Sequence, residues 1–261
     1  MHSYDLILMS GNQIWHQFFL ILALLVGAIF LWWDSRYWPM ALSQKLALML
    51  VSSVAIFLGS ALPGFFAEGY VDSQIQDFFW DPAYRFQPAI YAFLLGPKSV
   101  LGGFILAFLA VAGYKNLFNV RYDTSDSFAR GTIAIMAIGR LGCIAQHCCF
   151  GRPTHSHWGV DLGDGVLRYP VQVIESVFLF SLLILIFRFH SKNLFSGLRF
   201  FILFAAYGFF RFIIEFWRES VSLNIIGLGF YQWLALLMGG LGIYQLRKRQ
   251  NKIRAKDTAT Y

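Results

Sequence analysis

The stretch GLRFFILFAAYGFFRFIIEFW, residues 197–217, shows what kind of protein this chain forms. About 20 mostly apolar residues cross the hydrocarbon layer of a bilayer as a helix, and this stretch is that long. It nevertheless carries Arg211 and Glu215 close to one end. Ionisable groups inside a membrane span are costly, so they are functional candidates by default. The stretch therefore predicts a membrane helix that contributes to a polar site.

The composition of the whole chain agrees with a membrane protein. Of its 261 residues, 57% are hydrophobic and 13% charged, and the charged share is about half that of a soluble domain. The mean hydropathy is +0.57, which excludes an ordinary soluble enzyme. The formal net charge is +7, but the excess is concentrated near the C-terminus. That concentration argues against a nucleic-acid partner, which a basic face would recognise.

Six further apolar runs accompany residues 197–217. They are 14–33, 45–66, 88–112, 129–149, 171–190 and 224–245. Backbone groups in lipid must be hydrogen-bonded within the segment, and these runs are too long for barrel strands, so each is expected to be a helix. No Lys or Arg precedes Asp34, so the first run is expected to be a retained span rather than a cleaved signal. We predict an all-α, seven-span domain over residues 1–246 and a basic cytoplasmic tail over 247–261.

The positive charges between the spans predict the orientation of the chain. Counted with the tail, connections on one face hold fourteen Lys and Arg residues, against four on the other face. Cytoplasmic loops carry the excess of Lys and Arg. The N-terminus is therefore expected outside and the C-terminus in the cytoplasm. Glycines inside the runs, such as Gly102, Gly103, Gly239 and Gly240, are expected to permit close helix contact.

Polar side chains from three predicted spans fall at the same, outer end. Runs 129–149 and 197–217 point outward, and run 171–190 begins outside. Their outer ends carry Arg140, Gln172, Glu175, Arg211, Glu215 and Arg218. A guanidinium group donates paired hydrogen bonds and keeps its charge in an apolar environment, which suits a phosphate. We therefore predict a site for an anionic phospholipid head group at the outer monolayer.

Two other interpretations stay open at this point, and the first is the plainer one. Arg211 and Glu215 lie four residues apart, so they can simply neutralise each other on one helical face. The crowded residues His147, Cys148 and Cys149, with the histidines that follow, are of the types that bind zinc or copper. Their spacing matches no standard zinc pattern, so we expect no metal and no cofactor.

Three segments of the second half of the chain occur in an order that is typical of one enzyme family. They are Gly139-Arg140-Leu141-Gly142 with Gly151-Arg152-Pro153-Thr154 and Trp158-Gly159, then Tyr169-Pro170-Val171-Gln172-Val173-Ile174-Glu175, and then Tyr207-Gly208 through Arg211, Glu215, Phe216 and Arg218. Together they resemble the signature of the bacterial prolipoprotein diacylglyceryl transferases. The seven-span layout with an outside N-terminus agrees with that family.

The resemblance implies a multi-pass transferase of the bacterial plasma membrane. That family moves a diacylglyceryl group from phosphatidylglycerol to a cysteine thiol of a lipoprotein precursor and releases glycerol phosphate. By resemblance, Arg140, Arg211 and Arg218 hold the phosphate, and Glu175 and Glu215 orient them or handle protons. The supporting residues implied are Gly142, Gly151, Gln172, His16 and His147. Candidates for the base that frees the thiol are Glu175, Glu215, His16 and His147.

The chain departs from the family signature at specific places. An amide and a carboxylate of the signature are replaced by Cys143 and Cys148, and thiols are weak hydrogen-bonding partners. A His-Gly-Gly segment appears as Leu101-Gly102-Gly103, and an early tyrosine falls near His16. Cys143 and Cys148 are either thiolates activated by the nearby Arg140 or inert packing residues.

Two other functions remain as alternatives. The first is a lipid-modifying enzyme with another acceptor, such as a sugar, an amine or a second lipid. The second is a protein that binds or transports anionic lipid without turnover. A retinal-binding receptor is disfavoured because run 224–245 contains no lysine for a Schiff base.

Overall fold

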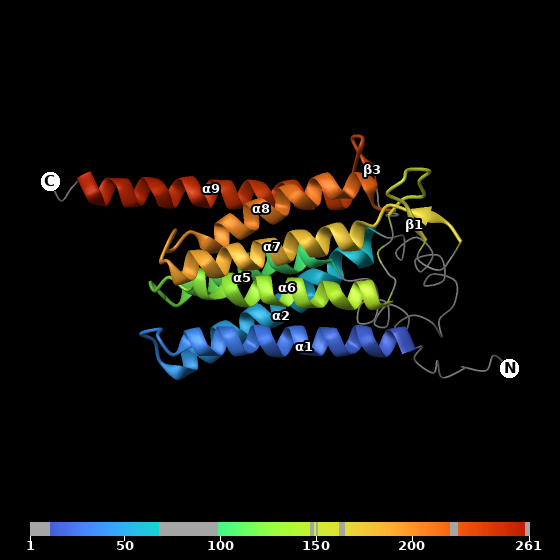
Figure 1. Cartoon of the computed structure of the whole chain (residues 1–261). Coiled ribbons are helices and arrows are strands. Elements are labelled where there is room, and N and C mark those ends of the chain that lie inside the picture. Colours follow the sequence, from blue (N-terminus) through green and yellow to red (C-terminus); the bar gives the residue numbers. More distant parts are fainter. Residues whose placement is uncertain are drawn as a thin grey trace, which may run out of the picture.

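The computed structural model describes residues 11–67, 99–146, 149, 151–161, 165–219 and 224–258, without the side chains of 11–13, 16, 64–67, 224 and 253–258. Within these ranges, seven long helices lie side by side as one bundle (Figure 1). They are α1 Gly11–Ser35, α2 Leu42–Ala67, α5 Val100–Leu117, α6 Ser125–Gln146, α7 Val171–Ser191, α8 Arg199–Ile214 and α9 Phe230–Thr258. The predicted all-α class is confirmed.

Short elements occupy the connections at one end of the bundle. The last turn of α8 tightens into a 3₁₀ turn, η2 Glu215–Trp217. Strands β1 Val160–Asp161 and β2 Leu167–Arg168 form one antiparallel hairpin, and β3 Asn224–Ile225 and β4 Leu228–Gly229 form another. Both hairpins lie at the end where α1 begins and opposite the end where α9 finishes (Figure 1).

Six of the described helices are long and apolar enough to cross a bilayer: α1, α2, α5, α6, α7 and α8. The protein is therefore a multi-pass membrane protein. Helix α9 falls outside this group because Gln232, Tyr244 and Gln245 interrupt its apolar half and basic residues fill the rest. The seventh span and the orientation of the chain across the membrane stay predictions.

Several predicted boundaries were wrong, and the largest error is at the last run. Residues 224–229 form the β3–β4 hairpin instead of a helix, because Ile226 and Gly227 turn the chain with positive φ angles of 52° and 76°. Helix α9 then begins at Phe230 and continues to Thr258, through most of the predicted tail. After Gly242 this stretch contains no Gly or Pro and is rich in Lys, Arg and Gln, which favour helix.

The predicted run 88–112 is only partly described, and its far boundary was also wrong. Residues 88–98 lie outside the described part of the chain, and α5 continues to Leu117, five residues beyond the predicted end. Helix α6 ends at Gln146 rather than at 149. At the start of α5, the hydroxyl of Ser99 accepts a hydrogen bond from the Gly102 amide and caps the helix.

The helices pack in close pairs at glycines. A Cβ on Gly102 of α5 would lie 2.3 Å from the carbonyl oxygen of Gly59 in α2, and one on Gly208 of α8 would lie 2.4 Å from the Gly239 amide in α9. Only glycine permits these approaches. The prediction was wrong for Gly240, where an added Cβ would meet nothing within 4 Å.

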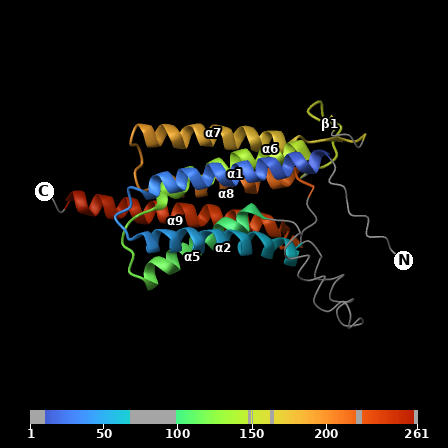
Figure 2. The same ribbon diagram turned by 90° about the horizontal axis from the view of Figure 1, so that it is seen from below.

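The buried core is apolar and lies between the helices of the second half of the chain and α5. Ile133 of α6, Leu182 of α7, Phe204 of α8 and Met238 of α9 belong to a single cluster of buried side chains. Turned by 90°, the bundle has α7 along one edge and α2 with α5 along the other (Figure 2). This packing holds the ends of α6, α7 and α8 together at the end where the two hairpins lie.

Candidate phosphate-binding site

The polar residues predicted to meet at one end of the bundle do meet there. Arg140 lies near the end of α6, Glu175 in the second turn of α7 and Arg211 in the last turn of α8. All three side chains are buried, with exposed fractions of 9%, 3% and 7%. A buried charge is stable only when it is paired, so three charged groups from three helices must balance one another.

Glu175 is the centre of this group. One of its carboxylate oxygens, Oε2, pairs with the Arg140 guanidinium. The other, Oε1, accepts a hydrogen bond of 2.9 Å from the Tyr207 hydroxyl on α8. The carboxylate thus links α6, α7 and α8, and both of its oxygens are engaged. This arrangement suits an orienting role for Glu175 better than proton transfer.

The second carboxylate, Glu215, stands between two arginines. Its Oε2 lies 2.8 Å from Nη1 of Arg211 and 3.8 Å from Nε of Arg218. The first pair is the local i, i+4 contact that the plainer interpretation expected. The charges around this pair are not purely local, however, because Glu175 on α7 also interacts electrostatically with Arg140, Arg211 and Arg218. The five groups form one network across three helices and η2.

This network has more positive than negative charge and unused hydrogen-bonding atoms. Three arginines face two glutamates, which leaves one net positive charge among the five groups. Within the described residues, Nε of Arg140, Nη1 of Arg211, Nε of Arg218 and both oxygens of Glu215 make no hydrogen bond of good geometry. Buried donors usually have partners, so this arrangement can accept an oxyanion.

The thiols lie close to the same arginine, although not all of them are described. Cys143 in the last turn of α6 and Cys149 just beyond it are partly buried, and both interact electrostatically with Arg140. Cys149 has a positive φ of 62°, which is uncommon outside glycine. Cys148 and His147 fall outside the described residues. The backbone of His16 lies in α1, but its side chain is not described.

The segment that follows α6, residues 151–153, holds Arg218 in place through backbone contacts. Gly151 forms an isolated β-bridge with Arg218, and the Arg152 amide donates to the Trp217 carbonyl over 2.8 Å. A Cβ on Gly151 would lie 2.2 Å from the Tyr169 carbonyl oxygen, so a glycine is required. Arg168 of β2, in the same group of strands, pairs with Glu219. The predicted residue Gly151 therefore positions the segment that carries Arg218.

The other predicted supporting residues lie beside the network. Gln172 is one turn before Glu175 in α7 and is 2% exposed. Gly142 is buried in α6, two residues after Arg140. Leu101, where the resemblance predicts the family's histidine, is buried in the apolar core. No group of three or more His, Cys, Asp or Glu residues that could hold a metal lies within the described ranges. His147 and Cys148, two of the residues whose types bind zinc or copper, are not among the described residues.

Sequence reasoning missed two residues of this site. Tyr207 was part of a motif but received no role, although it lies one turn before Arg211 on the same helix face. Cys149 was considered only as a metal ligand. The signal for Tyr207 was available, because a tyrosine buried in a membrane helix needs a partner for its hydroxyl. Nothing in the local sequence indicates that Cys149 approaches Arg140.

The fold and the site together define a class: a polytopic membrane protein with a buried arginine and glutamate network at one end of its helices. Comparison with known proteins identifies the family. The family model for prolipoprotein diacylglyceryl transferase matches residues 8–247. The chain therefore belongs to the prolipoprotein diacylglyceryl transferase family.

Curated relatives of this family match most of the chain. The phosphatidylglycerol–prolipoprotein diacylglyceryl transferase of Bordetella parapertussis is 30% identical over 217 residues, 77% of each chain. The protein of the same name from Aliarcobacter butzleri is 29% identical over 253 residues, which are 90% of this chain and 89% of the relative. The second such transferase of Clostridium perfringens is 25% identical over 191 residues, 70% of this chain and 73% of the relative.

Proposed function

We propose that the protein transfers the diacylglyceryl group of phosphatidylglycerol to a cysteine thiol of a lipoprotein precursor. Family membership supports this reaction, since the matched relatives are named for it. The observation that carries the proposal for this chain is the buried network of Arg140, Arg211 and Arg218, with one net positive charge and unused donors. A phosphate diester in lipid is the anion that such a network fits.

The reaction replaces one bond at a single carbon atom. The precursor's sulfur attacks the glycerol carbon that carries the phosphate ester, and a carbon–sulfur bond forms as the carbon–oxygen bond breaks. The electron pair of the broken bond leaves on the phosphate oxygen, so glycerol phosphate is released. Guanidinium groups fixed around that oxygen stabilise the charge that develops on it. The proton of the thiol must pass to a base.

The two glutamates support different roles in this scheme. Glu175 has both oxygens engaged, by Arg140 and by Tyr207, so it holds Arg140 in position. Glu215 has no hydrogen bond of good geometry to the described residues and stands beside Arg211. We assign Glu215 as the proton acceptor in preference to Glu175. His16 and His147 stay candidates from the sequence.

The thiols of this chain offer an alternative at the same place. Cys143 lies in the last turn of α6, close enough to Arg140 for an electrostatic interaction. Either Cys143 or Cys148 acts as a thiolate in the transfer, or both are packing residues. Alanine at each position separates the two roles. Unchanged transfer in both variants rules out the thiolate role.

The location of the reaction follows from the predicted orientation. The arginine network lies at the end opposite the basic half of α9 (Figure 1). Because basic residues favour the cytoplasm, we place the network at the outer face of the bacterial plasma membrane. An exported precursor and an outer-monolayer phospholipid both reach this position. Phosphatidylglycerol, the precursor peptide and the membrane are the partners proposed.

Complementation tests the proposal in a living cell. A bacterium depleted of its own diacylglyceryl transferase is given the full chain, Arg140→Ala or Arg247→Gln. We expect rescue by the parent and by Arg247→Gln, which changes an exposed charge on α9, and no rescue by Arg140→Ala at equal membrane level. Failure of the parent, when the precursor is exported, would overturn the proposed reaction. Mass spectrometry of lipids in those cells detects transfer to another acceptor.

A further inference from the structure

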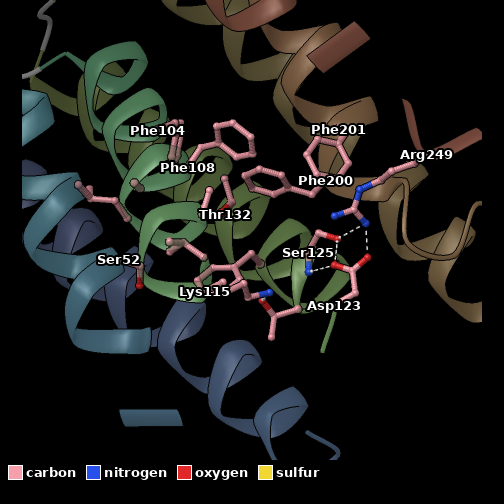
Figure 3. Close-up of a pocket in the computed structure, with 16 residues that line it drawn as sticks. Ser52, Phe104, Phe108, Lys115, Asp123, Ser125, Thr132, Phe200, Phe201 and Arg249 are labelled. Atoms are coloured by element: carbon pink, nitrogen blue, oxygen red, sulfur yellow. Dashed lines mark hydrogen bonds and ion pairs between the residues drawn. The ribbon is translucent and has the colours of Figure 1, made fainter. Parts of the chain in front are cut away.

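A cavity lies at the end of the bundle opposite the arginine network. Its volume is about 120 Å³, and it lies between α2, α5, α6, α8 and α9 (Figure 3). The walls are mostly aromatic and aliphatic. Phe104 and Phe108 of α5 and Phe200 and Phe201 of α8 line it, and the rings of Phe108 and Phe201 pack edge to face with 6.1 Å between their centres. Its interior is therefore suited to a hydrocarbon chain rather than to water.

The rim of the cavity is charged. Lys115 at the end of α5, Asp123 in the connection to α6 and Arg249 of α9 line its mouth (Figure 3). Two cations and one carboxylate leave a net positive charge there. A slot with apolar walls and a cationic mouth has the polarity of a phospholipid with a negative head group.

Both cations keep hydrogen-bond donors for a ligand. Nη1 of Arg249 makes all the hydrogen bonds of this side chain, to Asp123, to the Ser125 hydroxyl at 3.3 Å and to the Gly197 carbonyl at 2.9 Å. Its Nε and Nη2 therefore have no partner among the described residues. The Lys115 ammonium donates to the Thr124 hydroxyl at 2.8 Å and to the Tyr122 carbonyl at 2.9 Å, and one proton remains.

The guanidinium is held in place by an aromatic ring. Its central carbon lies 4.4 Å from the centre of the Phe201 ring. Phe201 also lines the cavity, so the same side chain borders the hydrocarbon slot and supports the cation at its mouth. Stacking fixes the guanidinium plane, which lowers the entropy lost when it binds a phosphate.

We propose that this cavity binds an anionic phospholipid of the monolayer at the basic end, with one acyl chain between α5 and α8 and the phosphate on Arg249 and Lys115. The basic half of α9 draws such lipids to the surface, because it adds Lys252 about one turn after Arg249 on the same helix face. This site is separate from the arginine network and does not depend on the proposed transfer reaction.

The expected effect of this lipid is to join two parts of the bundle. Helix α2 packs on α5, and α8 packs on α9. The cavity lies between these two pairs and α6. A chain that fills it adds contacts on both sides, so the bound lipid stabilises the folded protein, and the stabilisation rises with the logarithm of the lipid concentration above its Kd.

Photoaffinity labelling tests the site directly. The full chain is reconstituted in phosphatidylcholine nanodiscs without precursor peptide. The probe is phosphatidylglycerol, or phosphatidylcholine, with a diazirine near the end of one acyl chain. After illumination, labelled peptides are located by mass spectrometry. We expect the anionic probe to label the α5 and α8 peptides of the cavity about fivefold more than the zwitterionic probe.

Two pairs of variants show whether the mouth and the slot act as described. Arg249→Gln is compared with Arg247→Gln, which makes the same charge change at an exposed position of α9. Val111→Phe, which fills the slot and leaves both cations in place, is compared with Leu109→Phe on the exposed face of α5. We expect Arg249→Gln and Val111→Phe to lower the labelling of the cavity peptides about fivefold, and the two controls to leave it unchanged.

The possible outcomes separate this site from the transfer site. Labelling near α6 and α7 at the arginine network reports the other site and is expected to be the same in all four variants. Equal labelling of the cavity by both probes overturns the proposal, because the cationic mouth then selects nothing. Absence of cavity labelling by either probe also overturns it, as does labelling that Val111→Phe leaves intact.

Discussion

Three arginines near each end of the bundle make ion pairs that can be compared, and the two groups are bonded differently. At the basic end each arginine has its own aspartate: Arg130 with Asp34, Arg199 with Asp126 and Arg249 with Asp123. At the other end Arg140, Arg211 and Arg218 share Glu175 and Glu215. The first group is balanced in charge, and the second has one positive charge in excess.

Hydrogen bonding separates the two ends in the same way. Arg199 is 3% exposed and donates to the Leu194 carbonyl at 2.9 Å and to the Asn193 side chain at 3.3 Å, besides its ion pair. Within the described residues, no buried side-chain nitrogen or oxygen at the basic end lacks a hydrogen bond, whereas several at the network do. A buried arginine that is bonded through all its nitrogens, such as Arg199, therefore has a structural role. The incompletely bonded arginines of the network, and Arg249 at the mouth of the cavity, are prepared for a ligand.

The largest expected effect is the loss of turnover at the network. Arg140→Ala removes a cation that stabilises the departing phosphate, so we expect the initial rate of thioether formation to fall by about 100-fold or more. The rate is measured with purified protein, phosphatidylglycerol vesicles and a precursor peptide. Arg130→Ala also breaks a pair with an aspartate, but at the basic end. Equal losses in the two variants would break the distinction between the ends.

The second effect concerns stability at the basic end. Arg199→Met leaves the Asp126 carboxylate without its cation, and the free energy of unfolding should fall by about 3 kcal/mol. Unfolding by titration with a denaturing detergent measures this value. Arg247→Met on the exposed face of α9 is the control and should change little. A neutral result for Arg199→Met would contradict a structural role for that arginine.

A smaller effect on the transfer rate is expected from the hydrogen bond that Glu175 accepts from Tyr207. Tyr207→Phe removes the hydrogen bond of 2.9 Å to Glu175 but keeps the ring. We expect the transfer rate to fall about tenfold because Arg140 loses part of its support. Tyr244→Phe, at an exposed position of α9, is the matched control. If both variants keep the parent rate, Glu175 does not need Tyr207 to orient Arg140.

The smallest effect is a pH dependence at the basic end. Burial raises the pKa of Asp123, but hydrogen bonds from Ser125 and Arg249 and the positive charge of Arg249 outweigh burial and lower the pKa below its ordinary value of 3.8. A lowered pKa in the folded state stabilises the protein above the ordinary value, and the stabilisation is lost as the pH falls through the folded pKa.

Comparison with Asp123→Asn measures that contribution. The stability of the parent relative to the variant should be constant near neutral pH and should shrink as the pH is lowered below about 4. Thermal unfolding at a series of pH values gives the difference. A difference that grows as the pH falls would show that the carboxylate is not stabilised by Arg249.

Much of this architecture could be predicted from the lengths of the apolar runs and from the positions of the ionisable residues inside them. Arg140, Glu175 and Arg211 were placed together because three spans of alternating direction deliver their ends to one side of a bilayer. The β3–β4 hairpin could not be predicted, since Ile225 and Ile226 extend an apolar run and the turn depends on a positive φ at Ile226. Branched residues rarely adopt that conformation, so the sequence favours a helix there.

The bonding within the site was also beyond the sequence. Spacing showed that Arg211 and Glu215 share a helix face. It did not show that Glu175 would pair with Arg140 and accept a hydrogen bond from Tyr207. Such contacts depend on the rotation of α6, α7 and α8 about their axes. Close glycine contacts and the Gly151 loop set those rotations through tertiary packing, and local residue patterns carry little information about them.

Measuring both products of one reaction tests the proposed transfer directly. Purified protein in phosphatidylglycerol vesicles is given a cysteine-bearing precursor peptide, and thioether-linked peptide and free glycerol phosphate are measured together. We predict that the two products appear in equal amounts and that both are lost in Arg140→Ala. Glycerol phosphate without modified peptide would contradict the proposed reaction. So would Arg140→Ala if it formed as much of both products as the parent.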